Sequence, residues 1–434
     1  MNNILYFPTR YFPAISGAEF YLQRMAEILT SRYNYIIDIY TSNAVDFKAL
    51  RDPQGKIIAN NEKYYNTVNN LKIHRFSANY HLPLNEKIIF IKNLEEFKHI
   101  NISDECLQKF VENGPFLPDL INFFLRTQKQ YYKLIHSTFF PYFNLLISLI
   151  VGRNFGIPTV CTPFFHFSNP RYLDKPLIDI LKNFDLLIAC TNIEKKVLSK
   201  TYGIPEKKIE VIPMGVDYKI FDNIHNTKLN EFYFKEKFFK EKEKKYKMVL
   251  FCGYKNFEKG AISILKSIPF VLRKFKKVYF VFIGPSTIAF NRELSKIHKL
   301  TNAKIINFTP DNLTGYYDIK KMTAFNETNV YLMPSRSDAF GIAFLEAWAA
   351  EKPVIGANSG ATPEVIKNNI DGFLVKFNDP IDIAEKVVKL LKNKKLRRRF
   401  GLAGKLKVFK NYTWDIVAVK THKIYQDLIH GYEK

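Results

Sequence analysis

Residues 4–29 read ILYFPTRYFPAISGAEFYLQRMAEIL. The run Ile4–Phe7 is apolar and strand-like, and it is followed by a loop through Ser16 and Gly17. The next apolar residues recur at helical spacing, and they are Phe20, Leu22, Met25, Ile28 and Leu29. A strand, a glycine-containing turn and an amphipathic helix in this order predict the opening of a Rossmann-like domain.

The same alternation of strand-like and amphipathic runs continues along the whole chain, as expected for βαβ units on parallel sheets. Further strands of the first series are predicted at 36–41, 72–76, 134–136, 159–162, 186–190 and 208–212. A second series is predicted at 248–252, 278–283, 304–308, 329–333, 353–356 and 372–375. The charged, irregular segment 226–247 between the two series is interpreted as a linker or an insertion.

These series predict an α/β chain of two doubly wound, Rossmann-like parallel-sheet domains facing each other across a cleft. The predicted domains are 1–215, joined by a C-terminal helix at 414–434, and 216–413. The helix is predicted from a face made by Ile416, Val417, Val419, Ile424, Tyr425 and Leu428. Open α/β sheets bind ligands at the carboxyl ends of their strands, so the functional motifs are expected on loops that follow strands.

Composition limits the class of protein. The 434 residues are 47% hydrophobic, which is enough for two cores, and the net charge is +24. This charge favours anionic partners, namely nucleic acid, lipid headgroups or phosphorylated substrates, although a lysine-rich solvated surface explains it equally well. Four scattered cysteines indicate neither a zinc site nor a disulfide framework. We expect a cytoplasmic protein without a signal peptide, and we interpret the uncharged run 134–152 as a strand and a buried helix.

The densest group of candidate site residues is Pro334–Ala347, directly after the predicted strand 329–333. Gly341 permits close backbone approach, and the N–H groups at the start of the following helix suit a diphosphate. Asp338 and Glu346 are carboxylates that can accept hydrogen bonds from vicinal sugar hydroxyls. The candidate donor-binding residues of this segment are Asp338, Phe340, Gly341, Ile342, Ala343 and Glu346.

The segment resembles the retaining GT-B glycosyltransferases of group 1, also called glycosyltransferase family 4, and the resemblance spans nearly the whole chain. The family has an E-x7-E pattern around this turn. The resemblance implies that Asp338 lies near the donor sugar and that Glu346 binds the nucleotide ribose. Asp338 is one methylene shorter than the family's first glutamate, so its sugar preference or positioning is expected to differ.

Gly253–Gly260 resembles the family's G-R-x4-K-G loop, which makes Lys259 the phosphate-binding lysine and Gly253 a donor-site residue. A cation at this place stabilises the charge that develops on a leaving diphosphate. Tyr254 occupies the family's arginine position, and the adjacent Lys255 is the candidate substitute.

Other motifs carry further expectations. Ser16–Glu19 is similar to the family's G-G-A-E, which implies a diphosphate contact at Gly17; Ser16 is a candidate helix N-cap and Glu19 a first-turn acid. His166, after the strand 159–162, is expected to line the donor-sugar pocket. The run 211–217 is expected to be a hinge. In the turn that begins at Gly360, Thr362 is predicted as the N-cap of a helix.

The resemblance implies a retaining hexosyl transfer from a UDP- or GDP-sugar to an acceptor hydroxyl of a glycan or lipid-linked glycan. No D-x-D motif follows a predicted strand, so we expect the transfer to be metal-independent. The catalytic candidates are His166, Lys259 and Asp338, and no cofactor, metal or nucleic acid is expected. Two alternatives remain: a sugar-nucleotide epimerase of the same fold, and a basic protein that binds lipid or nucleic-acid surfaces. Peripheral contact with an anionic membrane on the cytoplasmic face is compatible with glycosyl transfer.

Overall fold

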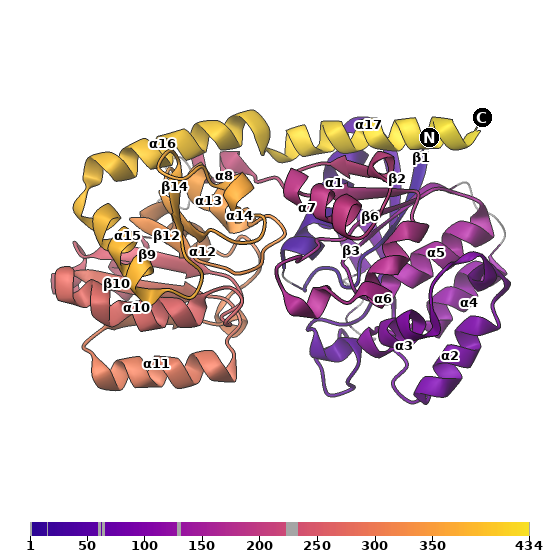
Figure 1. Cartoon of the computed structure of the whole chain (residues 1–434), viewed down its shortest axis with the longest axis horizontal. Helices are drawn as coiled ribbons and strands as arrows, with labels where there is room; N and C mark the ends of the chain where they lie inside the picture. The colour runs from indigo at the N-terminus through magenta and orange to yellow at the C-terminus, as the bar shows by residue number, and fades with distance from the viewer. Residues whose placement is uncertain are drawn as a thin grey trace. The chain divides into compact units, whose positions relative to one another are not determined.

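The computed structural model describes residues 2–14, 16–59, 62, 66–127, 132–222 and 233–433. It contains two compact units, shown in Figure 1. Unit 1 comprises Met1–Phe165, Pro170–Pro213 and Trp414–Lys434, and unit 2 comprises His166–Asn169 and Met214–Thr413. Unit 1 ends at Pro213, two residues before the expected boundary at 215. The segment His166–Asn169 was expected in the first domain but belongs to unit 2.

Unit 1 is built on an eight-stranded sheet in the order β3-β4-β2-β1-β5-β6-β7-β8. Every pairing is parallel except the antiparallel pair β3 and β4. The strands are β1 Asn2–Phe7, β2 Tyr35–Ser42, β3 Thr67–Val68, β4 Leu71–Phe76, β5 Tyr132–Thr138, β6 Thr159–Thr162, β7 Leu186–Ala189 and β8 Ile209–Val211. The two-residue strand β3 is the one strand here that was not predicted.

Helices flank this sheet and close its core. They are α1 Gly17–Tyr33, α2 Leu84–Lys92, α3 Asp104–Asn113, α4 Pro118–Arg126, α5 Asn144–Phe155, α6 Lys175–Ile178, α7 Asn192–Lys196 and α17 Trp414–Glu433. The C-terminal helix α17 packs on α1, where Trp414 contacts the ring of Phe20 edge-on. Its buried residues include Val417 and Tyr425, but Val419, expected on the same face, is 56% exposed because it lies on the opposite side of the helix.

His136 on β5 ties α17 to the sheet. Its Nε2 lies 2.8 Å from Thr162 Oγ1, and its Nδ1 is hydrogen-bonded to the hydroxyl of Tyr425. Burial lowers the pKa of His136 to about 3. The ring is therefore neutral at physiological pH and serves to hold unit 1 together.

This histidine predicts an acid-sensitive unit 1. Between pH 6.5 and about 3 the unfolded chain protonates His136 and the folded chain does not, so stability falls as pH falls, by about 1.4 kcal/mol per pH unit. Urea unfolding followed between pH 7 and 4 should show a shallower loss of stability for His136→Gln than for the wild type. Parallel pH profiles would contradict this role.

Unit 2 is built on a six-stranded sheet in the order β11-β10-β9-β12-β13-β14, and all of its pairings are parallel. The strands are β9 Lys247–Cys252, β10 Val278–Ile283, β11 Lys304–Phe308, β12 Val330–Met333, β13 Val354–Ala357 and β14 Gly372–Val375. Together with the sheet of unit 1, this confirms the prediction of two doubly wound, largely parallel α/β sheets.

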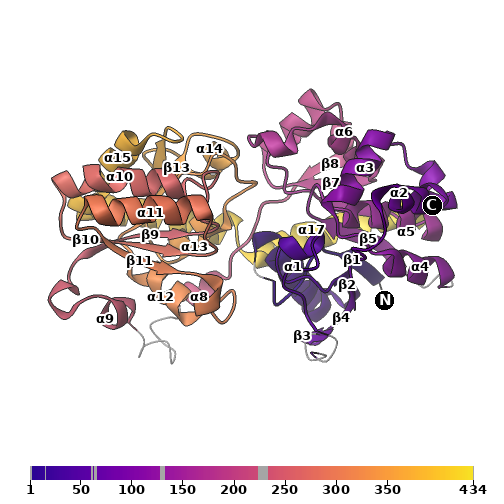
Figure 2. The same ribbon diagram turned by 90° about the horizontal axis from the view of Figure 1, so that it is seen from below.

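The helices of unit 2 lie on both faces of its sheet; Figure 2 shows α10 and α11 on one side and α8 and α12 on the other. They are α8 Tyr218–Asp222, α9 Phe234–Phe238, α10 Ala261–Lys274, α11 Ile288–Leu300, α12 Ile319–Glu327, α13 Ile342–Ala349, α14 Thr362–Val365, α15 Pro380–Lys392 and α16 Lys394–Asn411. The motif Pro334–Ala347 begins directly after β12 and continues into α13.

The segment predicted as a linker or insertion is part of unit 2 over its described residues, which begin at 233. Phe239 stacks on Tyr279 of β10 with ring centroids 3.8 Å apart, and Phe234 is buried against Phe308 of β11. The linker interpretation is therefore wrong for residues 233–247, where the phenylalanines cover the edge of the sheet; residues 226–232 lie outside the described residues.

The run 134–152 forms most of β5 and a largely buried α5, which confirms its interpretation as a strand followed by a core helix. In the part of the chain that the structure describes, no helix combines the length and the apolarity that crossing a bilayer requires. The four cysteines are free thiols.

Candidate functional site

Three loops of unit 2 meet at the carboxyl ends of β9, β12 and β13. Gly260 has a positive φ of 76°, and a Cβ there would come within 2.3 Å of the Pro334 carbonyl oxygen, so only glycine permits this approach. The Arg336 N–H donates to the Glu258 carbonyl oxygen at 2.7 Å. The Ser359 hydroxyl donates to the Arg336 carbonyl oxygen, also at 2.7 Å. The motif loops are therefore fixed against one another by their backbones.

An ion pair between Arg336 and Glu258 joins two of these loops a second time. The Arg336 Nε donates to Glu258 Oε2 at 2.9 Å and its Nη2 to Oε1 at 2.5 Å, so the contact is bidentate. Both residues lie inside motifs that the sequence singled out, but the pairing was not predicted because it joins positions far apart in the chain.

Lys259 and Asp338 form the centre of the cluster. The Lys259 ammonium lies 2.7 Å from Asp338 Oδ2, and both side chains are partly buried. Burial alone would raise the pKa of the Asp338 carboxyl. The Lys259 charge, the Lys259 hydrogen bond and the Phe340 N–H outweigh burial and hold that pKa below its usual value, so Asp338 is ionised at neutral pH.

His166 joins this pair, as part of unit 2. Its Nδ1 lies 3.4 Å from the Ser337 hydroxyl oxygen. Burial, together with the nearby Lys259 charge, lowers the pKa of His166 to about 4, although the Asp338 carboxylate opposes the shift. The imidazole is therefore neutral at physiological pH, beside a lysine and a carboxylate.

Helix α13 begins at this cluster with no side chain capping it. Gly341 occupies its N-cap position with φ 96°, and a Cβ there would meet the Phe344 ring at 2.6 Å. Phe340 is buried and packs edge-on against Tyr412, whereas Ile342 and Ala343 in the first turn are partly exposed. The positive end of the helix dipole and its first N–H groups lie next to Asp338 in the chain, which suits a phosphate group.

Glu346 on α13 is only 2% exposed and forms a buried ion pair with Lys321 of α12. The Lys321 ammonium lies 2.7 Å from Glu346 Oε1, and it also sits 3.6 Å from the centre of the Tyr316 ring. Glu346 is therefore a buried, charge-paired residue and not a solvated helix glutamate. Lys321 was missed because, in the sequence, it looks like one surface lysine among many.

Tyr331 on β12 is buried within electrostatic reach of both carboxylates. Burial raises its pKa, and the charges of Glu346 and Asp338 raise it further, so both acids lie within electrostatic reach of this ring. The two acids have separate cationic partners, Lys321 and Lys259, and the site therefore has two distinct halves.

Family comparisons agree with this geometry. The family model for glycosyl transferases group 1 matches residues 233–407, and the model for glycosyltransferase family 4 matches residues 102–219. The chain is a group 1 glycosyltransferase of family 4. This membership confirms the resemblance and identifies the chain as a glycosyltransferase, not a sugar-nucleotide epimerase or a basic surface-binding protein.

Individual relatives cover much of the chain. An uncharacterised glycosyltransferase of Methanocaldococcus jannaschii is 24% identical over 98% of this chain and 99% of its own length. A phosphatidyl-myo-inositol mannosyltransferase of Mycobacterium leprae is 30% identical over 42% of this chain and 48% of its own. The structure of Anabaena HepE in complex with UDP-glucose covers 98% of this chain and 100% of its own, with a TM-score of 0.69 and 14% identity. Such structural neighbours show that this glycosyltransferase has the GT-B fold.

Lys255 of the glycosyltransferase is buried away from the cluster's hydrogen bonds. Its ammonium donates to Asn307 Oδ1 and, at 2.8 Å, to the Phe308 carbonyl oxygen at the end of β11. Burial lowers its pKa to about 8. These two bonds hold the Lys255 side chain at the carboxyl end of β11. Among the residues that the structure describes, no contact with the other candidate donor-binding residues supports the prediction that Lys255 replaces the family's arginine, so this stays a prediction. The backbone of Gly253 packs closely against Gly284, because a Cβ on Gly284 would come within 2.1 Å of the Gly253 carbonyl oxygen.

Gly17 belongs to unit 1 and is the first residue of α1. Ser16 occupies the N-cap position but makes no cap hydrogen bond, because its hydroxyl donates to the Glu19 carboxylate. Glu19 is buried and paired with Arg10 at 2.7 Å, so it is more than a solvated first-turn acid. Arg10, which also stacks 3.6 Å from the Phe47 ring centre, was not singled out in the sequence.

Thr362 is the first residue of α14 and Ala361 holds the cap position, so the prediction of a Thr362 cap is wrong by one residue. The buried hydroxyls of Thr362 and Ser335 make no hydrogen bond to any described residue. Within the described ranges, no group of three or more His, Cys, Asp or Glu side chains is arranged to hold a metal ion.

Proposed function

We propose that this glycosyltransferase moves a hexosyl group from a UDP- or GDP-sugar to a hydroxyl of a glycan or lipid-linked glycan, with retention at the anomeric carbon. The observation that carries the proposal is the Lys259–Asp338 pair beside the uncapped start of α13. A lysine and free helix N–H groups are suited to a diphosphate, and an ionised carboxylate to sugar hydroxyls. The UDP-glucose complex of the HepE neighbour supports the same ligand class.

The proposed reaction breaks the bond between the anomeric carbon and the diphosphate oxygen on the same face that the acceptor attacks. The departing diphosphate oxygen takes the acceptor proton as negative charge develops on it. Lys259 and the α13 N–H groups stabilise this charge, which is the largest contribution that a site of this kind can make. His166, neutral at pH 7, is proposed to hydrogen-bond the sugar, and Gly17 is proposed to contact the diphosphate.

The two carboxylates are proposed to hold different parts of the donor. Glu346, oriented by Lys321, would accept hydrogen bonds from the ribose hydroxyls, and Asp338 from hydroxyls of the transferred sugar. The unpartnered hydroxyls of Ser335 and Thr362 follow β12 and β13 and are further candidates for donor contacts, since buried hydroxyls in proteins usually have partners.

Asp338→Asn tests this division. The substitution keeps the side-chain size but removes the charge that pairs with Lys259, so we expect the affinity for the intact nucleotide sugar to fall about tenfold while that for the free nucleoside diphosphate changes little. Calorimetric titrations with both ligands measure the two affinities. Equal losses for the two ligands would refute a sugar-specific role for Asp338.

The reaction is proposed to need no metal, because Lys259 and the helix N–H groups supply the positive charge that a divalent cation would otherwise provide. Donor turnover should therefore be unchanged after exhaustive dialysis against EDTA. A loss of activity that Mg²⁺ or Mn²⁺ restores would overturn metal independence and leave the donor class standing.

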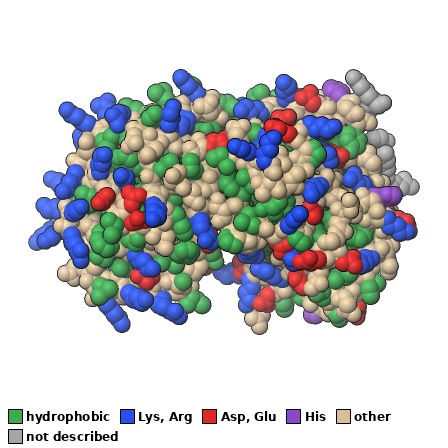
Figure 3. Space-filling view, in the orientation of Figure 1, with side chains coloured by type: hydrophobic (Ala, Val, Ile, Leu, Met, Phe, Trp, Pro, Cys, Tyr) green, Lys and Arg blue, Asp and Glu red, His purple; other side chains and the backbone are tan. Residues whose placement is uncertain are grey.

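Contact with an anionic membrane surface is proposed for the outer face of α16. Leu402, Leu406 and Phe409 recur at helical spacing and are 39%, 60% and 57% exposed. The helix carries eight Lys or Arg residues and no Asp or Glu, and Figure 3 shows basic side chains gathered over this part of unit 2. An apolar stripe between cations is the pattern of an interfacial helix on anionic lipid.

Vesicle flotation tests the membrane contact. The wild type should float with mixed phosphatidylglycerol and phosphatidylcholine vesicles at low salt, and Leu406→Ser with Phe409→Ser should not. Val419→Ser, which changes an equally exposed apolar residue on α17, is the matched control and should float like the wild type. Equal flotation of all three proteins would refute docking through α16.

The proposed activity itself is tested by mixing the protein with each candidate nucleotide sugar and following release of the nucleoside diphosphate, including the slow transfer to water when no acceptor is present. Anomeric proton NMR of the product reports retention or inversion. Release from at least one UDP- or GDP-sugar, with loss in Lys259→Gln, supports the proposal, and no release from any donor contradicts it.

A further inference from the structure

A cavity of about 420 Å³ lies in unit 2 at the amino ends of β12 and β13. Thr328 and Asn329 directly precede β12, and Lys352 and Pro353 directly precede β13. The donor-site loops follow the carboxyl ends of the same two strands. The cavity therefore lies at the opposite ends of these strands from the Lys259–Asp338 pair. It is not part of the proposed donor site.

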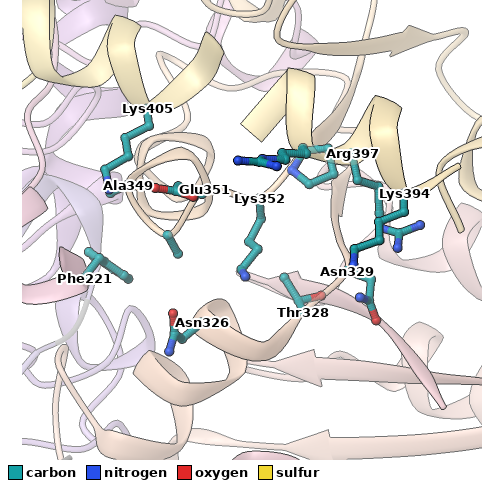
Figure 4. A pocket seen from close by; sticks show the side chains of 13 residues that line it. Phe221, Asn326, Thr328, Asn329, Ala349, Glu351, Lys352, Lys394, Arg397 and Lys405 are labelled. Atoms are coloured by element: carbon teal, nitrogen blue, oxygen red, sulfur yellow. Dashed lines mark hydrogen bonds and ion pairs between the residues drawn. The ribbon is translucent and has the colours of Figure 1, made fainter. Parts of the chain in front are cut away.

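Basic side chains dominate the wall of this cavity. They are Lys352, Lys394, Arg397, Arg398 and Lys405, against one acid, Glu351. Figure 4 shows Lys352 extending between Asn326 and Thr328, with the α16 side chains Lys394, Arg397 and Lys405 across the cavity. Helix α16 supplies four of the five cations, and the cavity opens beside its first turns.

Two of these cations already have partners. Lys405 forms an ion pair with Glu351 at 2.8 Å. Glu351, the one acid in the cavity wall, is therefore not available to pair with the other cations. Arg397 donates to the Leu390 and Leu391 carbonyl oxygens at 2.6 and 2.9 Å and so caps α15. By contrast, no hydrogen bond or ion pair joins the side chains of Lys352, Lys394 or Arg398 to another described residue.

The surrounding helix ends do not balance the remaining charge. Helices α12 and α13 end at the cavity, at Glu327 and Ala349, and each C-terminus carries roughly half a negative charge. Together they offset about one of the three unpaired cations. Burial lowers the pKa of Lys352; Lys235 and Arg397 lower it further, whereas Glu351 and Glu327 oppose the shift. The Glu327 carboxylate already accepts hydrogen bonds from the backbone N–H groups of Phe234 and Lys235.

We propose that this cavity is a second ligand site of the glycosyltransferase, one that binds a phosphate-bearing anion through Lys352, Lys394 and Arg398. Lys352 is half-buried and Lys394 and Arg398 are exposed, so all three cations are accessible to a phosphate dianion, and the Arg398 guanidinium offers it paired N–H donors. Asn326 and Asn329 line the same wall and can add amide donors. The phosphate can belong to a soluble phosphorylated compound or to a lipid headgroup, because the same chemistry recognises both.

Pyrophosphate titration of the full-length protein tests the site. We expect Lys352→Gln with Arg398→Gln to lower the association constant of this site about tenfold or more, the usual effect of removing hydrogen bonds to a charged group. Lys395→Gln removes an exposed lysine from the same helix outside the cavity and should change it less than about twofold. Lys352→Arg, which keeps the charge, should retain binding if the double variant is unstable.

Hydrogen exchange locates the bound ion. Pyrophosphate should slow amide exchange in peptides that cover residues 349–353 and 394–398, and this protection should persist in Lys259→Gln, where the donor site is impaired. Protection confined to the loops 253–260 and 334–346, or identical titrations of the double variant and the wild type, would overturn the proposal. The result does not depend on whether any nucleotide sugar is turned over.

Vesicles identify the source of the phosphate. If retention on phosphatidic acid vesicles falls in the Lys352 and Arg398 double variant and pyrophosphate competes with it, the ligand is a lipid headgroup. If pyrophosphate binds at the cavity and retention is the same in the double variant, the ligand is a soluble phosphorylated compound. Either outcome supports the site, and the α16 stripe variants show separately whether the apolar residues contribute to docking.

Discussion

Lys259→Gln is expected to reduce kcat/KM for sugar transfer by about 10²–10³-fold, the usual loss when one preorganised donor to a developing negative charge is removed. The ammonium is already held 2.7 Å from Asp338 and beside the start of α13, so it needs little reorganisation when the diphosphate departs. Steady-state rates of nucleoside diphosphate release, measured with saturating acceptor, provide the comparison. The loss should appear mainly in kcat, because the lysine is worth most when the leaving group carries its full charge.

Lys266→Gln on α10 is the matched control, since it removes an exposed lysine from the helix that follows Lys259. It should leave kcat/KM within about twofold of the wild type. If Lys259→Gln were as active as Lys266→Gln, Lys259 would not be the residue that stabilises the leaving diphosphate.

Glu346→Ala is expected to destabilise unit 2 by about 3–5 kcal/mol, the usual penalty for leaving one member of a buried ion pair without its partner. The pair is 2% and 8% exposed, so water cannot replace the lost carboxylate around Lys321. Urea unfolding monitored by Trp348, which lies buried on α13, reports the change.

The double substitution Glu346→Leu with Lys321→Met separates stability from binding. With both charges removed the stability should largely return, because an apolar pair of similar volume avoids the desolvation cost of the ions. Nucleotide binding should not return, since the proposed ribose contact is gone. A double variant no more stable than Glu346→Ala would refute the energetic role of the pair, and one that bound nucleotide normally would refute the ribose assignment.

The strand pattern of both sheets was predictable because fully buried parallel strands leave short apolar runs that differ clearly from amphipathic helices. The strands β6, β10, β11 and β14 have the predicted bounds. The short β3 was missed because two residues carry too little pattern, and 233–247 was misjudged because its phenylalanines alternate with charges along a sheet edge. The prediction also places Val419 on the wrong face of its helix, because an apolar residue two positions from the buried Val417 lies on the opposite side of a helix.

Much of the candidate site followed from loops placed after strands, but its pairings did not. Lys259 with Asp338, Arg336 with Glu258, and Glu346 with Lys321 each join residues that only the folded sheet brings together. Lys255 shows the opposite case, because its neighbours in sequence favoured a phosphate role while Asn307 and Phe308, more than fifty positions away, hold its ammonium. Local motifs thus located the loops, and packing determined which charge meets which.

The central claim is that unit 2 binds a nucleoside diphosphate sugar at the Lys259–Asp338 pair, and a thermal-shift panel of UDP, GDP, ADP and their sugars tests it most directly. A ligand at 100 times its dissociation constant adds about 2.7 kcal/mol of stability, which raises the melting temperature by a few degrees. We predict such a shift for the nucleotides and sugars of one base, reduced in Lys259→Gln and unchanged in Lys266→Gln. No shift with any nucleotide, or equal shifts in all three proteins, would contradict the account.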